Sequence, residues 1–102
     1  MVRRLTALLM SLTLFAGSSA TAEEWSRARI SRLPDSAFAG VEISPDGRKV
    51  RHLPHHDETG AVDPAHLRAA RARLAQVKWL DPDSESVARR HLESHLRDLL
   101  EH

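Results

Sequence analysis

Apolar positions along this chain form four groups, each with its own spacing. Residues 5–16 are mostly apolar and carry no charge. Apolar residues then flank a turn within 38–53, and two later segments repeat them every three or four positions. A spacing of three to four is typical of amphipathic helices, whereas short apolar runs bounded by turn residues favour strands. The pattern therefore predicts one apolar N-terminal segment, one β-hairpin and two helices.

The hairpin is predicted over residues 38–44 and 48–53. Its apolar positions are Phe38, Val41, Ile43, Val50 and Leu53. Between the two segments lies Ser-Pro-Asp-Gly at 44–47, which fits a type I turn with a glycine at its exit. Because an isolated hairpin is marginal in water, we expect it to pack against the rest of the chain.

Two Asp-Pro pairs mark where the two helices begin. Asp63 and Asp81 suit the N-cap position, and the proline that follows each suits the first helical position. The first apolar stripe consists of Leu67, Ala70, Leu74 and Val77, and the second of Ala88, Leu92, Leu96, Leu99 and Leu100. The short connection, which holds Trp79 and Leu80, predicts an antiparallel αα-hairpin. We expect the apolar face of the β-hairpin to cover the seam between the helices.

The predicted fold class is therefore α+β, with a β-hairpin packed on a two-helix αα-hairpin in one domain over residues 33–102. Residues 23–32 are polar and rich in arginine and serine, and they predict either a flexible lead-in or a short helix. The chain has no cysteine, so no disulfide can staple so small a core. A bound metal, a partner or self-association could supply the missing stability, or helix packing could suffice.

Residues 1–22 have the three parts of a cleavable signal peptide. Arg3 and Arg4 precede the uncharged stretch, and small residues end in Ala20-Thr21-Ala22, where Ala20 and Ala22 form an A-x-A recognition site. The apolar stretch is shorter than the roughly 20 residues of a spanning helix, although an uncleaved membrane anchor is the alternative. We therefore expect a periplasmic or secreted protein that holds no membrane segment after cleavage.

Cleavage changes the charge balance of the chain. Of 15 Lys and Arg side chains, Arg3 and Arg4 would leave with the signal peptide, so 13 basic and 14 acidic side chains would remain. A net charge so close to zero gives no strong field to attract nucleic acid. Arg68, Arg71 and Arg73 also spread around the first predicted helix and do not form one stripe, so we expect no nucleic-acid partner. An unknown protein partner or self-association is the expectation that remains.

Three ordered blocks between Leu33 and Gln76 resemble a small domain associated with bacteriophage head proteins, including segments of prohead proteases, and with uncharacterised bacterial proteins. The blocks are LPDSAFA at 33–39, RHLPHHD at 51–57 and HLRAARARLAQ at 66–76, with Val62-Asp63 before the last. The resemblance implies a fold and assigns no activity, cofactor or catalytic residue. The predicted signal peptide departs from that family, because phage heads assemble in the cytoplasm.

Seven histidines follow the predicted cleavage site, and two groups of them suggest metal binding. His52, His55, His56 and Asp57 offer imidazole and carboxylate ligands suited to Zn²⁺, Cu²⁺ or Ni²⁺. His91 and His95 lie at i and i+4, which places both rings on one face of the second helix. The alternative for both groups is a structural or solvated role without any cofactor.

Known catalytic motifs do not account for these residues. The segment His91-Leu92-Glu93-Ser94-His95 differs from the zinc-protease motif H-E-x-x-H, since its acid comes one position late. No cysteine is present, and no serine has the context of an activated nucleophile. We therefore expect no enzyme. The sequence favours a small exported interaction module, with an exported protein that binds a divalent transition metal through its histidine-rich loop as the alternative.

Overall fold

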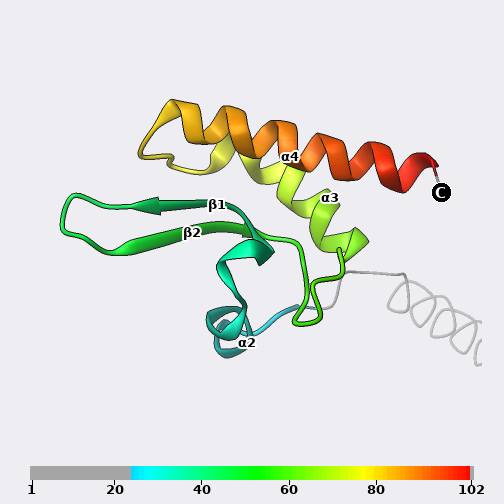
Figure 1. The fold of residues 1–102 in the computed structure, drawn as a ribbon, viewed down its shortest axis with the longest axis horizontal. Helices are drawn as coiled ribbons and strands as arrows, with labels where there is room; N and C mark the ends of the chain where they lie inside the picture. The colour runs from blue at the N-terminus through cyan, green and yellow to red at the C-terminus, as the bar shows by residue number, and fades with distance from the viewer. Residues whose placement is uncertain (1–23, 102) are drawn as a thin grey trace, which may run out of the picture.

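The computed structural model describes residues 24–101, in which a β-hairpin lies between a helical hairpin and a shorter helix (Figure 1). The predicted signal peptide, with Ala20 and Ala22, lies outside the described residues. In chain order the elements are α2 (Arg27–Arg32), the 3₁₀ turn η1 (Asp35–Ala37), β1 (Phe38–Ile43), β2 (Lys49–Pro54), α3 (Pro64–Arg73), the 3₁₀ turn η2 (Leu74–Gln76) and α4 (Pro82–Glu101). This arrangement confirms the predicted α+β fold.

β1 and β2 form an antiparallel pair in the predicted place. Their register sets Gly40 opposite His52 and Ile43 opposite Lys49. The turn closes where Gly47 N–H donates to the Ser44 carbonyl at 2.8 Å. Gly47 has a φ of 86°, which glycine adopts at little cost, so the turn residues account for the hairpin as expected.

Both helices begin at the predicted Asp-Pro pairs. The Asp63 side chain accepts from His66 N–H at 3.0 Å, and the Asp81 side chain accepts from Asp83 N–H at 2.9 Å. Each bond satisfies one of the backbone donors that a helix N-terminus leaves unpaired. α3 and α4 run in roughly opposite directions in space (Figure 1). Within residues 24–101, no helix is long and apolar enough to cross a membrane.

The helical seam forms the main core. The fully or almost fully buried residues there are Leu67, Ala70, Leu74, Ala88 and Leu92. Leu96 and Leu99 pack against this core and are partly buried, whereas Leu100 is 86% exposed. Leu100 was expected in the stripe, but successive helical residues differ by about 100° in direction, so Leu99 and Leu100 cannot both face α3. The C-terminal end of α4 also extends past the start of α3 (Figure 1).

The hairpin meets the helices through a different face from the one expected. Val41 and Ile43 are 39% and 63% exposed, whereas Glu42 is only 7% exposed. The Glu42 carboxylate accepts from Leu80 N–H at 3.0 Å and Asp81 N–H at 2.9 Å. It thereby holds the α3–α4 connection on the hairpin by hydrogen bonds.

A close approach of backbone and ring explains why β1 turns this face inward. A Cβ atom added at Gly40 would lie 2.6 Å from the ring of Trp79, so only glycine leaves room for the indole. Ala39 and Leu53 are the hairpin residues that reach the main core. The β-hairpin therefore covers the core between the helices with fewer apolar residues than its sequence pattern indicated.

The segment before the predicted domain is also part of the packed structure. Of the two alternatives for residues 23–32, the short helix is present as α2, and Trp25 is buried beside Leu33 and Phe38. The Arg51 side chain of β2 donates to the Leu33 carbonyl at 2.6 Å and to the Ile30 carbonyl at 3.0 Å. These bonds satisfy carbonyl groups at the end of α2 and attach it to the hairpin.

Candidate metal centre

Four histidine side chains from two distant parts of the chain converge where the loop after β2 meets α4. His55 and His56 lie in the loop after β2, and His91 and His95 lie on α4. One ring nitrogen from each residue lies within 4.8 Å of those of the other three. Two residues of the loop group and both residues of the helix group thus meet in space.

The backbone holds His55 firmly in the interior. His55 N–H donates to the Ala37 carbonyl at 2.9 Å, and Asp63 N–H donates to the His55 carbonyl at 2.8 Å. Its side chain is fully buried, whereas His56 and His95 are half-buried and His91 is exposed. One of the four rings therefore lies deep in the fold, and the other three lie nearer to solvent.

An unusual backbone conformation precedes the site. Leu53 has a φ of 62°, a left-handed conformation that a bulky residue rarely adopts and that costs roughly 1–2 kcal/mol. The Leu53 carbonyl oxygen lies 3.0 Å from His55 Nδ1. The strained residue therefore supplies the carbonyl group that orients the buried ring.

Both loop histidines are oriented in the same way. His55 Nδ1 lies 3.0 Å from the Leu53 carbonyl, and His56 Nδ1 lies 2.9 Å from the Gly60 carbonyl. A carbonyl oxygen only accepts, so each Nδ1 carries the hydrogen, and in a neutral ring Nε2 then has the free lone pair. Metal-binding histidines are oriented by such second hydrogen bonds.

The Nε2 atoms crowd together in a way that hydrogen bonds alone satisfy poorly. His91 Nε2 lies 3.2 Å from His55 Nε2 and 3.0 Å from His95 Nε2. If His91 Nε2 carries a hydrogen, it must share it between two acceptors or face a second donor. If it does not, its lone pair faces that of His55. A cation at the centre would remove this conflict, because every Nε2 could then present a lone pair to it.

These separations are close to those of a tetrahedral site. With metal–nitrogen bonds of 2.0–2.1 Å, ligand nitrogens would lie about 3.3 Å apart. Two of the observed separations are 3.0 and 3.2 Å, and the largest is within 4.8 Å. If the wider separations narrowed to that value, the four nitrogens would suit Zn²⁺, and imidazole equally suits Cu²⁺ and Ni²⁺.

The surroundings keep these rings uncharged. The pKa of His55 is lowered to about 4, chiefly by burial and in smaller part by the neighbouring histidines, although the hydrogen bond to the Leu53 carbonyl acts to raise it. Burial also lowers the pKa of His91 and of His95, with the proximity of His56 acting in the same direction. A neutral ring is the form that binds a metal, so these three residues are ready to do so at pH 7.

Two residues that the sequence grouped with these ligands lie elsewhere. His52 Nε2 is 3.0 Å from Glu42 Oε1, and its ring meets Trp79 edge-on with centroids 4.7 Å apart. Asp57 Oδ1 accepts from Thr59 N–H at 2.9 Å, from the Thr59 hydroxyl at 2.6 Å and from Ala61 N–H at 3.2 Å. These bonds lower the pKa of Asp57 and commit its carboxylate to a turn. Although His52 is close to His55 in sequence, it does not reach the site, because it is still part of β2.

Two residues that no sequence pattern marked as functional support the site through their backbone. The carbonyl groups of Leu53 and Gly60 orient the two loop histidines. Gly60 has a φ of 90°. A glycine shortly after the two histidines was therefore the sequence feature that could have indicated this turn. Nothing in the residue type of Leu53 indicates its role.

No family model, curated protein or solved structure shows a significant match to this chain. The resemblance of residues 33–76 to a phage-associated domain therefore stays a prediction.

Proposed function

We propose that this protein is a small exported protein that binds one divalent transition-metal ion, Zn²⁺, Cu²⁺ or Ni²⁺, through His55, His56, His91 and His95. The observation that carries the proposal is the convergence of four ring nitrogens within 4.8 Å of one another. The hydrogen bonds of both loop histidines to backbone carbonyls support it, since they leave the Nε2 lone pair of each ring free for a metal ion.

The number of ligands favours binding over catalysis. A catalytic zinc site has three protein ligands and keeps a fourth position for water or substrate, whereas a structural site is filled by four. Four imidazoles would fill a tetrahedral ion and leave no such position. The ion would then link the loop after β2 to α4, which adds a cross-link to a small protein without cysteine.

Export is the part of the proposal that rests on sequence alone. The charged start, the uncharged apolar stretch and the small residues Ala20 and Ala22 support a signal peptide over residues 1–22. N-terminal sequencing of protein recovered from the cell envelope or the medium tests this. We expect the chain to begin at Glu23, and recovery of the uncleaved chain from membranes would contradict export.

Calorimetric titration of the metal-free protein tests the binding function. We expect one Zn²⁺, Cu²⁺ or Ni²⁺ ion to bind per chain at pH 7.5. Replacing both α4 histidines, His91→Ala and His95→Ala, should abolish binding. His52→Gln is the matched control, because that histidine pairs with Glu42 outside the cluster, and it should bind like the wild type. Equal loss in the control and the double variant would contradict the proposed ligand set.

An interaction module is the second candidate, and one surface favours it. Val41 is 39%, Ile43 63% and Val87 56% exposed. Val41 and Val87 flank a shallow groove between β1 and α4. Light scattering of the wild type and of an Ile43→Asp variant tests self-association through this face. A monomer in both cases would leave only a separate protein partner for this candidate.

A further inference from the structure

The loop that carries His55 and His56 is closed by a tight turn between its histidines and α3. Asp57 N–H donates to the Ala61 carbonyl at 2.9 Å, and Gly60 N–H donates to the Asp57 carbonyl at 3.0 Å. His56 also pairs with Val62 in an isolated antiparallel bridge. Residues 57–61 thus fold back on themselves and return the chain toward α3.

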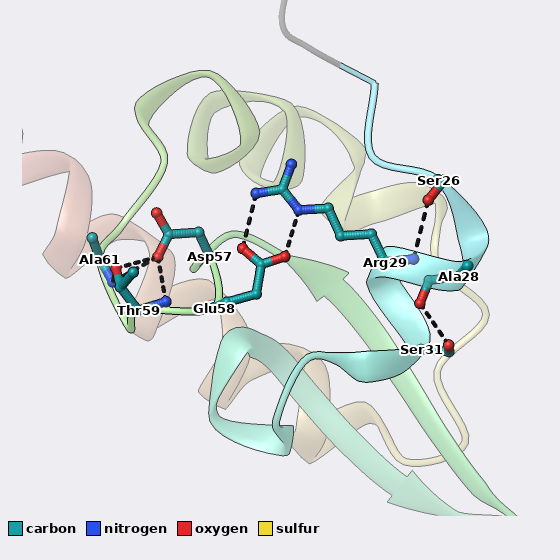
Figure 2. Close-up of polar contacts among 8 residues, drawn as sticks. All are labelled: Ser26, Ala28, Arg29, Ser31, Asp57, Glu58, Thr59 and Ala61. Carbon is teal, nitrogen blue, oxygen red and sulfur yellow. Dashed lines mark hydrogen bonds and ion pairs between the residues drawn. The ribbon is translucent and has the colours of Figure 1, made fainter.

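One carboxylate oxygen holds the turn together from within. Asp57 Oδ1 accepts two backbone N–H groups and one hydroxyl, from Thr59 and Ala61, as Figure 2 shows. An aspartate that accepts from residues two and four positions later fixes the path of the chain between them. Gly60 lies on that path, so the Asp57 side chain sets where the Gly60 carbonyl group lies.

The Gly60 carbonyl group is in turn the partner of His56. Its oxygen accepts from His56 Nδ1 at 2.9 Å. This bond fixes the direction of the His56 ring and leaves Nε2 with the free lone pair. One ring nitrogen of His56 lies within 4.8 Å of those of the other three histidines. A path of direct contacts therefore runs from the Asp57 carboxylate through the turn to a metal-binding nitrogen.

A contact from α2 holds the outside of the same turn. Arg29 donates to both oxygens of Glu58, with Nε at 2.6 Å and Nη2 at 2.9 Å (Figure 2). Two parallel bonds between a guanidinium and a carboxylate restrict orientation as well as distance. α2 is anchored to β2 by Arg51, so the turn is tied to the body of the fold.

We propose that Asp57 is a positioning residue of the metal centre, which acts by holding the turn that orients His56, and that the Arg29–Glu58 ion pair fixes this turn to α2. This inference rests on the proposed metal-binding function. It replaces the expectation that the Asp57 carboxylate is itself a ligand, because the group of converging ligand atoms does not include Asp57 and its Oδ1 accepts from three donors of the turn.

Two substitutions at one position separate positioning from ligation. Asp57→Asn keeps a side-chain oxygen that can accept from Thr59 and Ala61, but an amide is a far weaker metal ligand than a carboxylate. Asp57→Ala removes the acceptor. Zn²⁺ affinity of the full chain is measured at pH 7.5 by competition with a chromophoric chelator. We expect Asp57→Ala to lose about 10-fold to 100-fold in affinity, and Asp57→Asn to stay within about threefold of the wild type.

The path through His56 has its own test. In a His56→Ala background, Asp57→Ala should cause no further loss of Zn²⁺ affinity, because the ring that the turn orients is gone. Glu58→Gln should weaken Zn²⁺ binding less than Asp57→Ala. Glu85→Gln is its matched control, since it also removes one negative charge and one ion pair, with Arg89 at 3.0 Å, and it should bind like the wild type.

The outcomes separate this inference from the proposed function. Equal losses for Asp57→Asn and Asp57→Ala would overturn positioning and make Asp57 a ligand. Additive losses with His56→Ala would overturn the path through that ring. In both cases the metal site itself would stand, whereas an absence of Zn²⁺ binding by the wild type would overturn the inference together with its premise.

Discussion

His55 and His91 are 36 positions apart in the chain, and their Nε2 atoms lie 3.2 Å apart. The contact joins the loop after β2 to the middle of α4. Because His55 is fully buried and His91 is exposed, the pair runs from the interior of the fold to its surface. Two imidazole nitrogens at this separation repel each other when both rings are protonated, so the contact depends on pH and on any ion between them.

The first prediction concerns the stability of the metal-free protein as pH falls. The pKa of His55 is about 4 in the folded protein and near 6.5 in the unfolded chain. Between these values the unfolded chain binds more protons, so stability is lost as pH falls from about 6.5 toward 4. We expect urea unfolding in the presence of a chelator to show a loss of about 2 kcal/mol between pH 7.5 and pH 5 from His55 alone.

The control for this prediction removes the titrating ring. His55→Gln should flatten the dependence on pH between 7.5 and 5, whatever its effect on stability at pH 7.5. The lowered pKa of His91 and of His95 acts in the same direction, so some dependence should remain. A variant whose pH profile matches that of the wild type would show that His55 does not carry the effect.

The second prediction concerns the helical seam. Leu74 is fully buried and Leu96 is partly buried in the main core. Leu74→Asp should cost several kcal/mol, because it places an unpaired charge in the interior, and Leu96→Asp should cost less. Arg73→Ala, at an exposed position, should change stability by under about 0.5 kcal/mol. Thermal or urea unfolding that ranks the three variants in another order would place the core elsewhere.

The third prediction concerns the buried carboxylate on β1. Although its burial acts to raise it, hydrogen bonds from Leu80 and Asp81 N–H lower the pKa of Glu42 below its ordinary value. Glu42→Ala leaves both donors without this partner and should cost about 2 kcal/mol in the free energy of unfolding.

A surface carboxylate provides the comparison for Glu42. Glu85 pairs with Arg89 at the surface, and Glu85→Ala should cost under about 1 kcal/mol. Similar losses for the two variants would mean that Glu42 does not attach the α3–α4 connection to the hairpin.

Local sequence signals predicted most of the elements but not how they face one another. The turn at 44–47 and the two Asp-Pro pairs act through their own backbone, so they could be identified without knowing the fold. The inward face of β1 could not, because it is decided by the Trp79 ring over Gly40 and by the partners of Glu42 on the α3–α4 connection. An apolar pattern at Val41 and Ile43 therefore indicated the wrong face.

The candidate site was predictable only in part for the same reason. Spacing placed His91 and His95 on one face of a helix, and composition marked the loop of His55 and His56. Whether the two groups meet depends on the packing of α4 against the hairpin, which no local pattern shows. His52 and Asp57 are near the site in sequence, but the strand and the turn direct their side chains to Glu42 and to Thr59 and Ala61.

The fourth prediction, and the most direct test, is the ligand set of the bound ion itself. X-ray absorption spectra of the protein loaded with one equivalent of Zn²⁺ at pH 7.5 report the number, type and distance of the ligands. We predict four nitrogen ligands at 2.0–2.1 Å with the scattering pattern of imidazole, and loss of this pattern in the His91→Ala, His95→Ala double variant. A spectrum dominated by oxygen ligands, or one unchanged in the double variant, would contradict the four-histidine centre.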